Sequence, residues 1–138
     1  NYAKAPYIQD VLDIISPVYN DLSINTLSDF NQSLIQRFCA YLGIQTSFRN
    51  ASEFNPTGDR VEKLISICNQ LGATTYLSGP AAKDYISNEF EGTNISLKWM
   101  EYGPFEPYDQ SVEPFSDYVS IVDTIAALGP ESSLNILI

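Results

Sequence analysis

The sequence predicts an α/β fold: a small, open, mainly parallel sheet of three strands with helices on both faces, preceded by two helices and followed by one. One observation is that segments with helical spacing of apolar residues alternate with short runs rich in β-branched and aromatic residues. The other is an internal similarity. The stretches that begin at Cys39 and Cys68 share Cys, Leu, Gly and Thr at the same offsets, 29 residues apart. We interpret them as two similar helix-to-strand corners, as expected for helices that connect parallel strands.

Two helices are expected first. In the stretch 5–15, apolar residues recur at i, i+3, i+4 and i+7, and Pro17 is expected to end this helix. The second helix is expected to begin after Thr26, a suitable N-cap, and to end at Gly43. Residues 44–48 then predict the first strand.

The middle of the chain predicts a helix over residues 59–72 and a strand over 74–78. Pro80 suits the first position of a further helix, which would direct Tyr85, Ile86 and Phe90 inward. A third strand is expected near residues 95–101.

A long ordered loop rich in Pro, Tyr and Phe is expected over residues 103–115. A last helix over 116–129 would carry four apolar residues inward: Tyr118, Ile121, Val122 and Ile125. The sequence does not assign a structure to the segment 131–138. The whole chain, residues 1–138, is expected to be one α/β domain.

The composition excludes several classes of function. The net charge is −10, with seven basic residues, so binding to nucleic acid or to an anionic membrane surface is not expected. Histidine is absent, which removes Ser-His and Cys-His catalysis, and no cofactor or metal site is expected. No apolar run is long enough to span a membrane. Cys39 and Cys68 are expected to be free, buried thiols.

Ser78, Gly79 and Lys83 form the first candidate site. Ligands of open α/β sheets bind beyond the carboxyl ends of the strands, and the start of a helix offers N–H groups to a phosphate or carboxylate. Gly79, Ala81 and Ala82 would be the donors, and Lys83 would add a positive charge. The alternative is that this turn is only a corner with a solvated lysine.

Three further residues are candidates for ligand binding. Arg49 and Arg60 are expected near the same edge of the sheet, although each has acidic neighbours with which it could pair instead. Tyr102 belongs to the aromatic stretch 99–108, which could form a pocket wall for a sugar or a base, or a lid over the core.

The chain resembles the WbqC-like protein family. The resemblance rests on "LIQRFCAYLGIQTSF", "GDRVEKLISICNQLGATTYLSGPAAKDYI" and "ISLKWMEY", and it runs from about Tyr2 to Leu128. The most specific part is the stretch 71–85. The chain is similar to the second half of such proteins, and their first half, with its His-Gln-Pro and Tyr-Leu-Pro-Trp motifs, is absent from it.

The resemblance implies a cytoplasmic bacterial protein of surface-polysaccharide (O-antigen type) biosynthesis. Its substrate would be a nucleotide-activated sugar or another anionic small molecule, and the activity a transferase, for which this segment alone would be inactive. The alternative is a non-catalytic binding or scaffold module whose Ser-Gly-Pro turn is structural. An incomplete sheet would also lead the chain to self-associate or to retain the missing first half.

Overall fold

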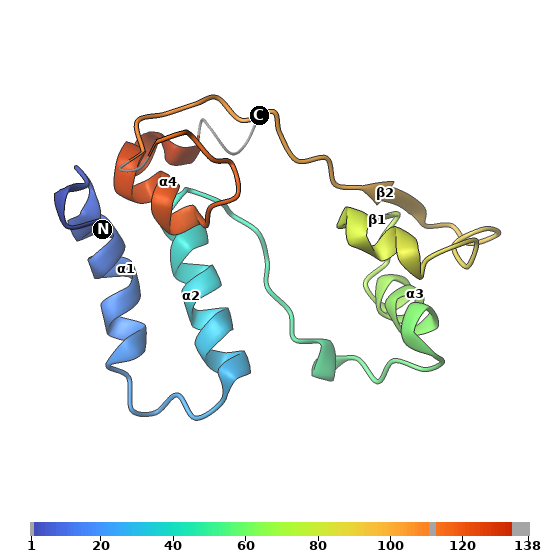
Figure 1. Cartoon of the computed structure of the whole chain (residues 1–138). Coiled ribbons are helices and arrows are strands. Elements are labelled where there is room, and N and C mark those ends of the chain that lie inside the picture. Colours follow the sequence, from blue (N-terminus) through green and yellow to red (C-terminus); the bar gives the residue numbers. More distant parts are fainter. Residues whose placement is uncertain (1, 111–112, 134–138) are drawn as a thin grey trace. The chain divides into compact units, whose positions relative to one another are not determined.

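The computed structural model describes residues 2–110 and 113–133 of the chain (Figure 1). It divides into two compact units. Unit 1 combines residues 1–46 with 104–138, and unit 2 is the segment 47–103. Each unit is described by itself below. That the whole chain is a single domain, and the second half of a longer protein, stays a prediction.

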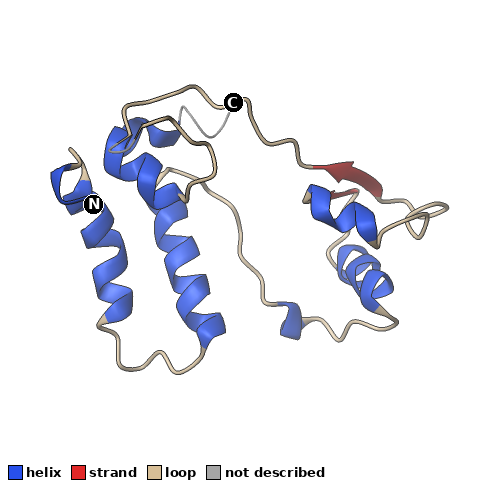
Figure 2. Cartoon of the chain, in the orientation of Figure 1, coloured by secondary structure: helices blue, strands red, loops and turns tan. Residues whose placement is uncertain are grey.

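Unit 1 is helical (Figure 2). Its described residues form three α-helices, with one-turn 3₁₀ helices at Tyr2–Lys4 and Gly129–Glu131. Helices α1 (Ile8–Tyr19) and α2 (Leu27–Tyr41) lie side by side, and α4 (Ile121–Leu128) packs against α1. The two helices predicted at the start of the chain are therefore confirmed.

The core of unit 1 forms where α1 meets α4. Its buried residues are Val11, Ile14, Ile125 and Ala126. Apolar side chains at helical spacing on both helices make this contact, and Ile125 is completely buried.

Pro17 does not end α1 as predicted, because the helix continues to Tyr19. Val18 is 4% exposed, so its packing holds the last turn in place. The Asn20 N–H also donates to the Ser16 carbonyl at 3.0 Å across the proline. Tertiary packing outweighs the local preference of proline here.

The two helix-to-strand corners have the same hydrogen bonds. The Ile44 N–H donates to the Cys39 carbonyl at 2.8 Å, and the Ala73 N–H donates to the Cys68 carbonyl at 2.9 Å. The glycine before each donor has a positive φ, 72° at Gly43 and 63° at Gly72. These are Schellman-type helix ends, which explains the repeated Cys-x-x-Leu-Gly pattern.

The strand predicted at residues 44–48 is wrong. This segment has no strand pairing, and Gln45 to Phe48 are exposed. An isolated extended segment loses its strand character because its N–H and C=O groups gain no partner strand. The corner after α2 therefore leads into a connection between the units, whereas the corner after α3 (Arg60–Gln70) leads into a strand.

Unit 2 contains helix α3 (Arg60–Gln70) and strands β1 (Thr75–Ser78) and β2 (Ser96–Trp99). Asp59 caps α3: its carboxylate accepts the N–H groups of Val61 and Glu62, at 3.0 and 3.1 Å. One-turn 3₁₀ helices at Ala51–Glu53 and Pro80–Asp84 complete the unit.

The sheet has two strands among the described residues, not the three predicted. The strands β1 and β2 are parallel, as predicted, with Tyr76 opposite Leu97 and Ser78 opposite Trp99. Tyr76, Leu97 and Trp99 lie on one face of the sheet and pack against the core of unit 2. The other face is open, with Leu77 53% exposed. Helices on both faces were therefore a wrong prediction for the part of the chain that the structure describes.

The helix predicted after Pro80 is instead a 3₁₀ helix that ends at Asp84. The chain then turns so that Ile86 and Phe90 enter the core, as predicted, at 4% and 7% exposure. Tyr85, which was expected inward, is half-buried. The core of unit 2 consists of Val61, Cys68, Ala82, Ile86, Phe90 and Ile95.

The last helix begins at Ile121, later than predicted, and Tyr118 is 95% exposed rather than buried. The side chain of Gln110 explains the late start, since it holds both backbone groups of Ser116 at 2.9 Å. These bonds keep the segment before Ser120 out of the helix. Residues 134–138, most of the segment left unassigned by the sequence, lie outside the described residues.

Both cysteines are free, as predicted; Cys68 is buried, but Cys39 is only half-buried. Within residues 2–110 and 113–133, no helix is both long and apolar enough to cross a membrane.

Candidate functional site

The Ser-Gly-Pro turn lies directly after β1 in unit 2. Ser78 is the last residue of the strand and is 7% exposed, and its carbonyl accepts the Met100 N–H at 2.7 Å. Gly79 is extended, with φ −68° and ψ 152°, so this position does not require glycine for its backbone conformation. A Cβ atom at Gly79 would come within 3.7 Å of the Tyr102 hydroxyl oxygen. The glycine therefore lies next to the tyrosine hydroxyl.

Lys83 and Trp99 lie together at the same edge of the sheet. The Lys83 ammonium nitrogen is 5.4 Å from the centre of the Trp99 ring, within the range of a cation–π contact. Trp99 is the last residue of β2 and pairs with Ser78 across the sheet. Because parallel strands end at one edge, the turn and the Trp99 ring are neighbours, and Lys83 and Tyr102 contact them.

The two arginine candidates have different environments. The Arg60 guanidinium lies over the Tyr85 ring at 3.5 Å, so it flanks the far end of the 3₁₀ helix. Arg49 instead forms an ion pair with Glu53, with 2.6 Å between Nε and Oε2, and lies over the Phe54 ring. For Arg49 the structure therefore confirms the alternative, in which this arginine pairs with an acidic neighbour.

Fewer backbone N–H groups are free to bind a ligand at this turn than the sequence predicts. The Ala82 N–H donates to the Gly79 carbonyl at 3.1 Å and is not available to a ligand. A 3₁₀ helix of five residues also has a smaller dipole than the α-helix that was expected. An anion at this turn would therefore depend more on side chains, namely Lys83 and Tyr102, than the sequence predicts.

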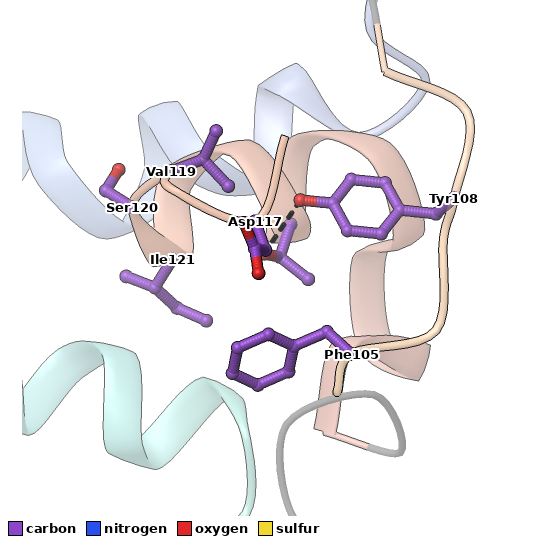
Figure 3. Close-up of a pocket in the computed structure, with 7 residues that line it drawn as sticks. Phe105, Tyr108, Asp117, Val119, Ser120 and Ile121 are labelled. Carbon is purple, nitrogen blue, oxygen red and sulfur yellow. Dashed lines mark hydrogen bonds between the residues drawn. The ribbon is translucent and has the colours of Figure 1, made fainter. Parts of the chain in front are cut away.

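Unit 1 contains a cavity of about 190 Å³ that the sequence did not predict (Figure 3). None of the six candidate residues lines it. Two aromatic rings, Phe105 and Tyr108, form its walls with the aliphatic side chains of Val119 and Ile121. Its polar lining consists of Asp117, Ser120 and Thr124.

A buried hydrogen-bond network fixes one wall of this cavity. The Tyr108 hydroxyl donates to Oδ2 of Asp123 at 2.8 Å and lies 3.2 Å from the Thr124 hydroxyl. The Gln110 amide also donates to Oδ2 of Asp123, at 3.0 Å. Asp123 is 8% exposed, so these donors compensate for the burial of its charge. The Phe115 ring meets the Tyr108 ring edge-on, with 5.3 Å between centres.

Three tyrosines of unit 1, Tyr2, Tyr41 and Tyr108, have raised pKa values. Burial is the main cause at Tyr108, and the neighbouring Asp123 carboxylate adds to it, whereas hydrogen bonds from Thr124 and Gln110 oppose it. Burial and a hydrogen bond to Asp123 likewise raise the pKa of Tyr2. Burial and a hydrogen bond of 2.5 Å to Asp10 raise the pKa of Tyr41. These tyrosines act as neutral hydrogen-bond donors.

One part of this cavity could be predicted from the sequence. The aromatic stretch 99–108 was expected to form a pocket wall or a lid, and Phe105 and Tyr108 do line a cavity. Asp117, Ser120 and Thr124 were missed because they were assigned to one continuous helix. Among the described residues, no group of three or more His, Cys, Asp or Glu side chains is placed to hold a metal ion.

Comparison with known proteins gives one family and one relative. The profile described as "WbqC-like protein family" matches residues 1–134. The uncharacterized protein Rv1507c of Mycobacterium tuberculosis (strain ATCC 25618 / H37Rv) is 32% identical over 133 residues. The match covers 96% of this chain but 58% of that protein, so the chain spans little more than half the length of the relative. No solved structure matches the chain significantly.

Proposed function

Because the chain belongs to the WbqC-like protein family, we propose that it is part of a bacterial protein of surface-polysaccharide (O-antigen type) biosynthesis. The proposed activity is that of a cytoplasmic transferase that acts on a nucleotide-activated sugar. The chain spans 58% of its relative, so the activity is proposed for the whole protein.

One observation supports this proposal most: at the edge where β1 and β2 end, the Tyr102 hydroxyl lies next to Gly79, and Lys83 lies over the ring of Trp99, which pairs with Ser78. A nucleotide-sugar carries a pyrophosphate, which needs positive charge and hydrogen-bond donors. It also carries a base, which stacks on aromatic rings. Lys83 and Tyr102 supply the charge and the donor, and Trp99 supplies the ring. Arg60 lies over Tyr85, at the far end of the 3₁₀ helix, and is not part of this arrangement.

A second candidate is a non-catalytic binding or scaffold module. Two observations favour it. The Ala82 N–H donates to the Gly79 carbonyl inside the turn, and the Ala82 side chain lies in the core of unit 2. In this case Ser78 and Gly79 only form the corner between β1 and the 3₁₀ helix.

A binding measurement on the intact protein separates the two candidates. Calorimetry with UDP-glucose, dTDP-glucose and GDP-mannose should detect binding of at least one of them. Lys83→Ala should weaken that binding about tenfold, or ~1.4 kcal/mol, because one charge-assisted contact is lost.

The matched control is Lys98→Ala. Lys98 is exposed on the open face of β2, so its removal changes the net charge equally without touching the turn. It should change the affinity less than about twofold, because Lys98 is on the opposite face of the sheet from Trp99 and its exposed charge is screened by salt. Equal losses in both variants, or no binding of any nucleotide-sugar, would favour the scaffold candidate.

A further inference from the structure

The cavity of unit 1 has the size of one six-membered ring. Its volume is about 190 Å³, and an apolar cavity of roughly 150 Å³ already accommodates benzene. A single ring with small substituents therefore fits, whereas a whole nucleotide does not, since pockets for ligands of that size are typically about 300 Å³ or larger.

The walls of the cavity offer flat apolar surfaces. Figure 3 shows the rings of Phe105 and Tyr108 with the Ile121 side chain around the same space. Tyr108 is already held in place by its bond to Asp123 and by its contact with Phe115, so binding does not have to order this ring. Aromatic walls of this kind pack against the C–H face of a ring.

Two polar side chains of the cavity, those of Asp117 and Ser120, have no hydrogen-bond partner among the described residues, whereas the Thr124 hydroxyl is bonded to Tyr108. No hydrogen bond or ion pair engages the Asp117 carboxylate within residues 2–110 and 113–133. The Ser120 side chain is at the N-cap of α4 but makes no capping hydrogen bond. A ligand that donates hydrogen bonds, such as one with several hydroxyl groups, satisfies Asp117 best.

The charge of the cavity argues against an anion. Of the described residues that line it, none is Lys or Arg, and Asp117 contributes a negative charge. A phosphate here would meet a carboxylate without a cation to compensate. This cavity thus differs from the Ser-Gly-Pro turn of unit 2, which has Lys83 and no acidic residue in the contacts described above.

We propose that the cavity of unit 1 binds an uncharged pyranose ring, with the ring face on Phe105 and Tyr108 and hydroxyl groups donating to Asp117. The residues of this site belong to unit 1, whereas the turn belongs to unit 2, and this proposal does not depend on the proposed function. A monosaccharide has about twelve heavy atoms, so binding in the millimolar range is expected for the isolated sugar.

The test is an amide-resolved NMR titration of the chain with uncharged sugars: glucose, galactose, mannose, rhamnose, fucose and N-acetylglucosamine. At least one should shift the amide signals of Phe105, Asp117 and Ser120 with a millimolar Kd. Phe105→Ala and Asp117→Ala should each weaken this binding about tenfold or more. Asp117 is exposed, so its replacement should leave the fold intact.

Tyr118→Ala is the matched control, because this neighbouring tyrosine is 95% exposed and does not line the cavity. It should leave the sugar affinity within about twofold of the wild type. Lys83→Ala should also leave it unchanged, which separates this site from the proposed turn. The proposal is overturned if no uncharged sugar shifts these signals. It is also overturned if only glucosamine or glucose 1-phosphate binds at them, or if Asp117→Ala binds the sugar as well as the wild type.

Discussion

Removal of one hydroxyl group, in the variant Tyr108→Phe, tests whether the network around Asp123 holds unit 1 together. That hydroxyl donates to the buried Asp123 carboxylate at 2.8 Å. A hydrogen bond to a charged group contributes about 1.5–3 kcal/mol, and a buried charge left without any partner costs about 3–5 kcal/mol. Because Gln110 still donates to Asp123 at 3.0 Å in the variant, the lower range applies. We expect the free energy of unfolding to fall by about 2 kcal/mol.

The assay is urea unfolding followed by far-UV circular dichroism, to which α1, α2 and α4 of unit 1 contribute most and α3 of unit 2 contributes less. The fluorescence of Trp99, the single tryptophan of the chain, follows unit 2 separately. A loss of ~2 kcal/mol corresponds to a fall of roughly 8–16 °C in Tm for a unit of this size. Tyr118→Phe is the control, since its hydroxyl is on a side chain that is 95% exposed. If Tyr108→Phe loses less than about 0.5 kcal/mol, or no more than Tyr118→Phe, the network does not stabilise unit 1 as argued.

The other predictions concern pH, thiols and one glycine. The raised pKa values of Tyr2, Tyr41 and Tyr108 mean that the folded state holds protons that the unfolded state releases near pH 10. Stability should therefore be unaffected by these groups below about pH 10 and fall as the pH rises above it; a pH titration of the urea midpoint showing no fall by pH 11 would contradict this. Denatured protein should titrate two thiols without reductant, and in native protein Cys39 should react with a thiol reagent before Cys68, whose pKa is raised by burial. Equal reaction rates of Cys39 and Cys68 in native protein, or fewer than two thiols in denatured protein, would refute this. Gly129→Ala should destabilise unit 1 by roughly 1–3 kcal/mol more than Gly92→Ala, because both glycines have a positive φ but only at Gly129 would a Cβ overlap the Tyr7 ring. Equal losses of unfolding free energy would show that the overlap is relieved without cost.

Helices, caps and corners were predictable because local physics determines them. The Thr26 cap, the repeated corners at Cys39 and Cys68 and the inward positions of Ile86 and Ile125 follow from spacing and from glycine at the helix ends. The parallel pairing of β1 and β2 followed from the segment that connects them.

The errors arose where a distant partner decides the local structure. Whether residues 44–48 form a strand depends on a neighbouring strand, which the sequence of the segment does not encode. The end of α1 depends on the packing of Val18, and the start of α4 depends on the side chain of Gln110 holding Ser116.

The candidate residues were predictable in type but not in arrangement. The order of elements indicated an edge with Ser78 and Gly79, and the structure adds that Tyr102 and Trp99 lie beside them. The cavity near Asp117 was only partly indicated: Phe105 and Tyr108 lie in a stretch expected to form a loop or a pocket wall, but Asp117 and Ser120 come from a segment that was interpreted as part of a helix. Self-association, or contact with a first half of the protein, stays a prediction; the exposed Leu77 on the open sheet face is consistent with either.

The central claim is that the turn after β1 binds the pyrophosphate of a nucleotide-sugar. The most direct measurement is an amide-resolved NMR titration of the intact, isotope-labelled protein with the nucleotide-sugar that binds best in calorimetry. The account predicts that the largest saturable changes fall on Gly79, Lys83 and Tyr102, with a change at the Trp99 indole N–H, and that Lys83→Ala reduces them. It would be contradicted if the nucleotide-sugar binds while these signals stay unchanged, or if the changes remain in Lys83→Ala at wild-type affinity.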